Sequence, residues 1–212
     1  MTKKIEKLSI VMAVHDNAEQ IERNLPLFLT QQSERTVEVI VVNDASADDT
    51  PDVLKRLKKD YPNLYTTFIP TAPINPRRHR LALSVGAKAA KGEWIILADI
   101  NCPPLSENSL EQFVATIEET DCELAMAFVS PRKDHAVSYK LWDRVEEAAT
   151  WLRKAERRGG CGHKGHWMKM RRGLYDAVAV PKERIHDTLY YFDEAVHGCR
   201  LAGLRLKIWL TI

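Results

Sequence analysis

The chain has 212 residues, of which 45% are hydrophobic and 28% charged, and its formal net charge at pH 7 is +2. This length and apolar content suffice for one large domain with its own hydrophobic core. Because no run of about eighteen apolar residues occurs and the first residues lack the apolar stretch of a secretion signal, hydropathy excludes a membrane-spanning helix, and we expect a cytoplasmic protein.

The first half of the chain alternates apolar runs with amphipathic segments. A helix that Pro26 is expected to bend or interrupt follows the first apolar run, and a second helix begins near Asp49. A third helix is expected to end at Gly92. This alternation is typical of an α/β fold with a mostly parallel sheet and helices on both faces. The predicted strands are residues 8–14, 37–43, 64–69 and 93–98.

The second half of the chain is less regular. Ser106 is a candidate N-cap for the first helix there, and two adjacent glycines close a longer one. The patterns predict helices at residues 106–120, 139–158 and 190–203, and strands at residues 123–129, 167–172 and 204–210.

Two of the predicted strands lead directly into an acidic residue. Asp44 follows the strand at 37–43, and Asp99 follows the strand at 93–98. Ligands of open parallel sheets bind beyond the carboxyl ends of the strands, so we expect the two carboxylates to be neighbours at one site.

Cysteine and charge patterns carry less information. The four cysteines are far apart, which favours reduced thiols, and Cys161 with His163 and His166 lacks an apparent fourth zinc ligand, so a basic loop is favoured there. Between Arg153 and Arg172, eight basic residues occur with one acid. This run fits a solvated helix face best, then a peripheral contact with anionic membrane at its inner face, and least a nucleic-acid patch, so no nucleic acid is expected.

Three segments in order resemble one known family. Residues 8–25, LSIVMAVHDNAEQIERNL, are similar to VSVIIPVYNEAENI; residues 41–50, VVNDASADDT, are similar to VVDDGSTDGT; residues 80–104 are similar to KxxALNxGIxxAxGExIxxLDADCxP. Together they resemble a family 2 glycosyltransferase of the GT-A fold, which has a Rossmann-like central sheet. The resemblance implies one domain over residues 1–212, with a nucleotide-sugar-binding half at 1–104 and a smaller, irregular acceptor-side half at 105–212.

The resemblance also implies roles for residues of the first half. Asp44 falls on the acid that binds uracil, while Ala13 and His15 fall where the base pocket is lined. Asn17 falls near the ribose. Arg78 and Arg80 lie near the basic position that faces the diphosphate.

Asp99 and Asn101 fall on the family's DxD pair, with the first residue toward the ribose and the second toward a divalent metal, Mn or Mg. Such an ion neutralises the charge that develops on a diphosphate leaving group. Asn101 replaces the second aspartate, and an amide oxygen is a poorer ligand than a carboxylate, so weak metal binding is expected. Asp49 replaces a usual glycine, and Trp167 replaces an asparagine of the acceptor-side segment.

An inverting transfer needs a carboxylate that takes the proton of the acceptor hydroxyl. The resemblance places this base at Asp193 or Glu194, with Asp193 slightly favoured. The alternative is that both acids only favour a helix N-terminus.

The function predicted from these residues is transfer of a sugar from a nucleotide-diphosphate donor, a UDP-sugar, to a hydroxyl of a glycan or lipid-linked acceptor. One alternative is a degenerate member that binds a nucleotide sugar or a partner without turnover. A nucleotidyltransferase is less favoured, because the first turn, AVHDNAEQ, has no glycine. No GxGxxG follows the first strand and no GxxxxGK[ST] occurs, which argues against dinucleotide and P-loop enzymes.

Overall fold

The fold is built on one mixed sheet. Seven strands pair in the order β3-β2-β1-β4-β7-β5-β9, and two short strands, β6 and β8, form a separate pair. The computed structural model describes residues 4–71, 78–104, 106–119, 124–129, 167–169, 177–185, 198–200 and 206–211.

The first four strands of the sheet are parallel. β1 pairs with both β2 and β4, so the strand order reverses at β1, and the crevice beyond its carboxyl end is where ligands of such sheets bind. All four agree with the predicted strands to within one residue at each end. Their bounds are β1 (Lys7–Val14), β2 (Thr36–Asp44), β3 (Leu64–Ile69) and β4 (Trp94–Ala98).

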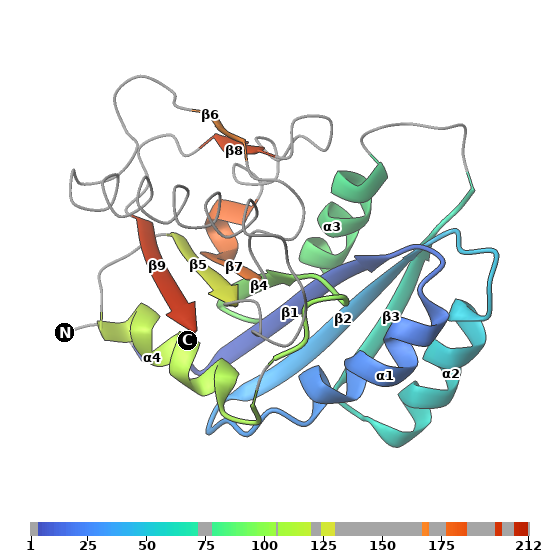
Figure 1. Cartoon of the computed structure of the whole chain (residues 1–212), viewed down its shortest axis with the longest axis horizontal. Coiled ribbons are helices and arrows are strands. Elements are labelled where there is room, and N and C mark those ends of the chain that lie inside the picture. Colours follow the sequence, from blue (N-terminus) through green and yellow to red (C-terminus); the bar gives the residue numbers. More distant parts are fainter. Residues whose placement is uncertain are drawn as a thin grey trace, which may run out of the picture.

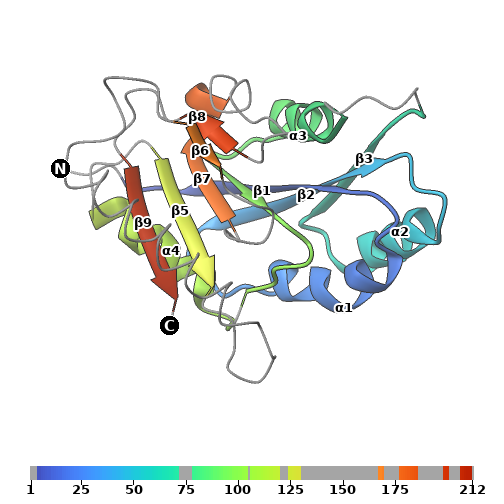
Figure 2. The same cartoon turned by 45° about the horizontal axis from the view of Figure 1, so that its top comes forward.

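Helices cover both faces of this parallel part, as predicted. Figures 1 and 2 show α1, α2 and α4 on one face and α3 on the other. The bounds are α1 (Ala18–Leu29), α2 (Thr50–Asp60), α3 (Arg78–Ala89) and α4 (Ser109–Glu119). None of the helices in the described part of the chain has the length and hydropathy needed to cross a membrane.

Alternate side chains of β1 point to opposite faces of the sheet and pack against the helices on each face. Leu8, Ile10 and Met12 are buried in the main core cluster together with apolar residues of α1, α2 and α4. Val11, between them, points to α3, where a Cβ added to Gly86 would lie 2.5 Å from Val11 Cγ1. Glycine at this position therefore allows α3 to approach the sheet closely.

Three expectations about the helices need correction, the first of them in part. Pro26 does not interrupt α1, which continues to Leu29 with the Thr30 N–H bonded to the Pro26 carbonyl at 3.0 Å, so the predicted interruption is wrong and the predicted bend stays a prediction. α4 begins at Ser109 rather than after Ser106. The residues between them form a local turn, in which the Ser106 N–H donates to Ser109 Oγ at 3.0 Å. α3 ends at Ala89 rather than at Gly92. Gly92 instead lies against β1, where a Cβ added to it would be only 2.6 Å from the Ser9 backbone nitrogen.

The second half adds strands to the same sheet. β7 (Ala177–Pro181) was not predicted; it pairs antiparallel with β4 and with β5 (Leu124–Val129), which pairs with β9 (Leu206–Thr211). A short 3-10 helix, Lys182–Arg184, follows β7.

β6 (Trp167–Lys169) pairs with β8 (Gly198–Arg200). The helix predicted at 190–203 is therefore wrong over 198–200, because pairing with β6 overrides the local helical pattern. Its remaining residues, and the helix predicted at 139–158, lie outside the described residues.

Candidate functional site

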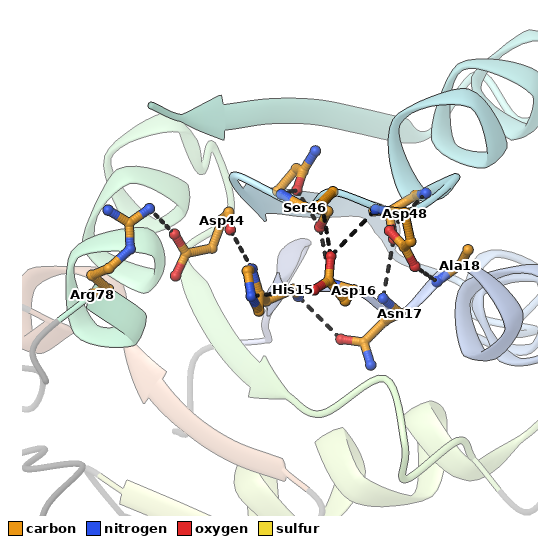
Figure 3. Close-up of polar contacts among 11 residues, drawn as sticks. His15, Asp16, Asn17, Ala18, Asp44, Ser46, Asp48 and Arg78 are labelled. Atoms are coloured by element: carbon orange, nitrogen blue, oxygen red, sulfur yellow. Dashed lines mark hydrogen bonds and ion pairs between the residues drawn. The ribbon is translucent and has the colours of Figure 1, made fainter. Parts of the chain in front are cut away.

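The carboxyl ends of β1 and β2 bring together side chains that are far apart in sequence. Val14 at the end of β1 lies opposite Asn43 of β2, so His15 and Asp44 follow at neighbouring positions. The His15 ring nitrogen Nδ1 lies 2.6 Å from the backbone oxygen of Asp44, and Figure 3 shows the two residues side by side. The imidazole is 62% exposed, so a ligand at this end of the sheet can reach it.

The Asp44 carboxylate forms an ion pair with Arg78. Arg78 is the first residue of α3, and its Nη2 donates to a carboxylate oxygen of Asp44 and, at 3.2 Å, to the backbone oxygen of Pro70. Only 14% of the Asp44 side chain and 18% of the Arg78 side chain are exposed. The pair places a hydrogen-bond acceptor and a donor side by side at the end of β2 (Figure 3).

Three further predicted residues lie near this pair. Ala13 is half-buried in β1, and Asn17 is the N-cap residue of α1, where its side-chain oxygen accepts the His15 N–H at 3.1 Å. Arg80 lies two residues beyond Arg78 in α3, so the helical repeat directs their side chains to different sides of the helix.

The loops after β1 and β2 are joined by hydrogen bonds from Asp16, Ser46 and Asp48, which we call the loop brace (Figure 3). The Asp16 N–H donates to Ser46 Oγ at 3.0 Å, and the Asp16 carboxylate accepts the Ala47 N–H at 2.7 Å. Asp48 accepts the Ala18 N–H at 2.9 Å. Sequence reasoning assigned no role to these side chains, although short polar residues after both strands favour such local bonds.

Asp48 binds the first residues of two helices. Its Oδ2 accepts the N–H of Ala18 in α1, and its Oδ1 accepts the N–H of Thr50 in α2 at 3.0 Å. Desolvation opposes ionisation, but side-chain and backbone hydrogen bonds from Thr50 and the backbone bond from Ala18 outweigh it and lower the pKa of Asp48. The carboxylate thus stays charged and holds the two loops in place.

Each of these loops contains one residue in the left-handed region. The φ angle is 49° at Asp16 and 50° at Ala45, and no other non-glycine residue in the described ranges has a positive φ. Aspartate tolerates the left-handed region through local hydrogen bonds. For an ordinary L-residue such as alanine, this conformation costs about 1–2 kcal/mol. Such strain at both strand ends is typical of a functional site.

A tight turn at residues 99–102 follows β4. The Cys102 N–H donates to the Asp99 carbonyl at 3.0 Å. The Asp99 oxygen Oδ1 accepts two bonds from Asn101, one from the backbone N–H and one from the side-chain Nδ2, each at 2.9 Å. The turn is therefore closed by its own side chains.

These contacts bear on the predicted metal site at Asp99 and Asn101. A divalent cation needs oxygen ligands, but the Asn101 amide directs its N–H group at the Asp99 carboxylate. Over the residues that the structure describes, no group of three or more His, Cys, Asp or Glu side chains could hold a metal. The pair fits an ion only if the Asn101 side chain rotates to present its oxygen.

Several predicted residues lie outside the described part of the chain. These are Asp193 and Glu194, the cysteine and histidines at 161, 163 and 166, and most of the basic run between Arg153 and Arg172. Trp167 is the first residue of β6. Their roles stay predictions.

Comparison with known proteins gives a family match over most of the chain. The sequence model described as Glycosyl transferase family 2 matches residues 9–177. The uncharacterized protein Rv1520 of Mycobacterium tuberculosis strain H37Rv is 32% identical over 96 residues, which cover 43% of this chain and 26% of that protein. The chain thus matches about a quarter of the length of this curated relative.

Two solved structures share the fold. The mannosyltransferase PcManGT from Pyrobaculum calidifontis, in complex with GDP-Man and Mn2+, has a TM-score of 0.64 and 18% identity over 98% of this chain and 57% of that one. TarS 1–349 from S. aureus, in complex with UDP, has a TM-score of 0.51 and 22% identity over 62% of this chain and 38% of that one.

Proposed function

The chain belongs to glycosyl transferase family 2, and we propose that it transfers a sugar from a nucleotide-diphosphate donor, a UDP-sugar, to a hydroxyl of a glycan or lipid-linked acceptor with inversion. The family and the GT-A fold expected from the three segments are confirmed. The observation that carries the proposal is the Asp44–Arg78 pair beyond the switch point of the sheet. The two halves at 1–104 and 105–212 are proposed to serve donor and acceptor.

The pair suits a uracil base. The hydrogen-bonding edge of uracil presents one N–H between two carbonyl oxygens. The Asp44 carboxylate can accept from that N–H while the Arg78 guanidinium donates to an adjacent carbonyl. We therefore assign Arg78 to the base together with Asp44, Ala13 and His15, and keep Arg80 as the candidate for the diphosphate. TarS was solved with UDP and PcManGT with GDP-Man, so both donor classes occur in this fold.

Asp99 and Asn101 are the residues that would hold a divalent metal, Mn or Mg. PcManGT was solved with Mn2+, and such an ion would neutralise the charge of the diphosphate. Because the Asn101 amide now donates to Asp99, presenting its oxygen to an ion means breaking that bond. We propose that metal affinity is weak for this reason.

The acceptor side rests on the family resemblance. Asp193, with Glu194 as the alternative, is proposed as the base that deprotonates the acceptor hydroxyl, and Asn17 is proposed to lie near the donor ribose. The protein is proposed to be cytoplasmic, with the basic run between Arg153 and Arg172 bringing it to the inner face of an anionic membrane, in keeping with a lipid-linked acceptor.

A second candidate function is donor binding without turnover. The observation that favours it is the Asn101 side chain, which satisfies Asp99 instead of offering a second carboxylate. Asn101→Asp separates the two candidates. A large gain in manganese-dependent donor hydrolysis indicates a decayed site, whereas unchanged hydrolysis in a protein that already turns over indicates a site that works with little metal.

The first test is a thermal-shift titration with UDP, GDP, CDP and NAD, each with and without manganese, because a ligand that binds only the folded state raises the unfolding midpoint. We expect selective stabilisation by UDP. Stabilisation without metal dependence would assign charge neutralisation to arginine. No response to any nucleotide would contradict the donor site.

Calorimetry of Asp99→Ala with UDP then tests Asp99 directly, since the variant is expected to give no binding heat. Asp60→Ala is the matched control, because Asp60 is an exposed acid at the far end of α2. Equal UDP binding by both variants would remove Asp99 from the site.

A further inference from the structure

Asn24 is a buried polar residue in the middle of α1. Its side chain is 5% exposed, and the helix buries Ile21, Leu25 and Phe28 on the same side. Asparagine is a poor helix former, and burying its amide without partners is costly. An apolar residue here would therefore make the helix more stable, unless the amide has a specific hydrogen-bond partner.

That partner is the turn after β4. Asn24 Nδ2 donates to the backbone oxygen of Ile100 at 2.9 Å, across 76 positions of sequence. At the other end of the amide, Asn24 Oδ1 accepts from Arg23 Nε at 3.2 Å. Both ends are satisfied, which fixes the orientation of the amide with its N–H toward Ile100.

The contact immobilises the peptide group between Ile100 and Asn101. Asn24 holds its carbonyl oxygen, and the Asp99 carboxylate holds its N–H at 2.9 Å. The Ile100 side chain is 1% exposed and belongs to the main core cluster, so the residue cannot shift outward freely. A flip of this peptide would break both hydrogen bonds and redirect the Asp99 and Asn101 side chains.

We propose that Asn24 is a positioning residue that sets the direction of the Asp99 and Asn101 side chains through the Ile100 carbonyl. The proposal rests on the donor-binding function proposed for those two residues. It explains why a helix packed in the core carries an amide at a point where it contacts the turn.

Asn24→Leu tests the proposal, because leucine keeps the volume and removes the donor. We expect an affinity for UDP, measured by calorimetry, about tenfold weaker, the usual effect of losing one hydrogen bond to a buried group. We also expect the Asn101 amide to lose hydrogen-exchange protection in the nucleotide-free protein, since the freed peptide can flip. Unchanged affinity together with unchanged Asn101 protection would overturn the proposal.

Leu25→Ala is the matched control, since Leu25 is buried in the same helix and adjacent in sequence. It should lower stability without changing UDP affinity and without a selective loss at Asn101. A merely structural role for Asn24 would make the two variants alike, with protection lowered evenly across the protein.

Asn24→Asp gives a second readout if Asn24→Leu does not fold. A protonated aspartic acid can donate to the Ile100 carbonyl, whereas the ionised form cannot. Its UDP affinity relative to the native protein should therefore rise as the pH is lowered through the pKa of this carboxyl, which burial raises and the neighbouring Arg23 guanidinium lowers. A ratio independent of pH would overturn the proposal.

The two proposals fail separately. If the native protein binds no nucleotide, the donor-binding function fails, but protection of the Asn101 amide still reports on Asn24. Loss of that protection in Asn24→Leu would then support the positioning role, and its retention would overturn it.

Discussion

The charged side chains at the two ends of β1 and β2 have different surroundings. At the amino end, Arg35 is 4% exposed, forms ion pairs with Glu111 and Glu118 of α4, and donates to the Ile5 carbonyl at 3.0 Å. At the carboxyl end, His15 is 62% exposed and Asp16 is 46% exposed. At the amino end the buried Arg35 is paired within the protein, whereas at the carboxyl end the buried Asp44–Arg78 pair lies beside the exposed His15 and Asp16.

Among the described residues, left-handed backbone at non-glycine positions occurs at the carboxyl end. Within the described residues, both non-glycine positions with positive φ, Asp16 and Ala45, lie in the loops there. Real proteins depart from locally favourable structure mainly where function requires it. The comparison therefore predicts that changes at the amino end alter stability and leave nucleotide affinity intact, whereas loss of the Asp44 carboxylate at the carboxyl end lowers nucleotide affinity.

The largest expected effect is that of Arg35→Met. Removing the guanidinium leaves Glu111 and Glu118 without their cation, which should lower the free energy of unfolding by about 2–3 kcal/mol, less than for a fully buried pair because Glu111 keeps 35% exposure. Urea denaturation measures this loss, and UDP affinity should not change. Lys4→Ala is the control: the Lys4–Glu34 pair is 66% and 80% exposed and should contribute less than about 0.5 kcal/mol.

The same variant should alter the acid sensitivity of the protein. The hydrogen bond from Arg35 lowers the pKa of Glu111 below its ordinary value of 4.5, although desolvation acts in the opposite direction. A carboxylate with a lower pKa in the folded state contributes stability that is full above the unfolded pKa and is lost as the pH falls through the folded pKa. Stability should therefore drop in acid, with a smaller drop in Arg35→Met. Equal acid slopes would contradict the assignment.

The next effect tests the other end of the strands. Asp44→Ala removes the acceptor of the Asp44–Arg78 pair, and UDP affinity should fall about ten- to hundredfold, as for loss of a charged hydrogen bond. The free energy of unfolding should also fall, by about 1–3 kcal/mol, because Arg78 is largely buried and loses its partner at a helix N-terminus, where a cation is unfavourable. A variant that loses stability but keeps UDP affinity would erase the contrast between the two ends.

The difference between the ends also separates what sequence predicts from what it does not. The parallel strands are mostly apolar, with few polar interruptions, and two of these runs lead into Asp44 and Asp99, so the sheet and the acids at its edge were predictable. β7 was not, because its five residues include two alanines and a terminal proline, and tertiary pairing rather than propensity makes them a strand.

The contacts that shape the site were also beyond local patterns. The Asp16 bond to Ala47 spans 31 positions, and the Asn24 bond to Ile100 spans 76. Such pairs depend on which strands become neighbours, and periodicity within one segment does not contain that information. A polar residue in a helix, such as Asn24, reads locally only as an unfavourable choice.

A smaller effect is expected for Asp48→Asn. The amide keeps an acceptor for only one of the two helix N-termini and loses the charge that interacts with both dipoles, so the free energy of unfolding should fall by about 1 kcal/mol. Thermal unfolding at neutral pH measures it. Because the folded protein lowers the pKa of Asp48, the difference from the native protein should shrink as the pH falls through that lowered pKa, and a difference independent of pH would contradict the capping role.

Ala45→Gly should have the smallest effect and the opposite sign. Ala45 has a φ of 50°, and the family segment that it resembles has glycine at this position. Glycine removes the strain of the left-handed conformation but adds freedom to the unfolded chain, so a net gain of about 0.5–1 kcal/mol is expected from denaturant titration. Glycine would adopt this loop conformation with less strain than alanine, but it would restrict the loop less. If that rigidity prepares the site for the nucleotide, UDP affinity of Ala45→Gly should stay level or fall slightly while stability rises. A loss of stability would mean that the loop brace does not hold Ala45 in this conformation.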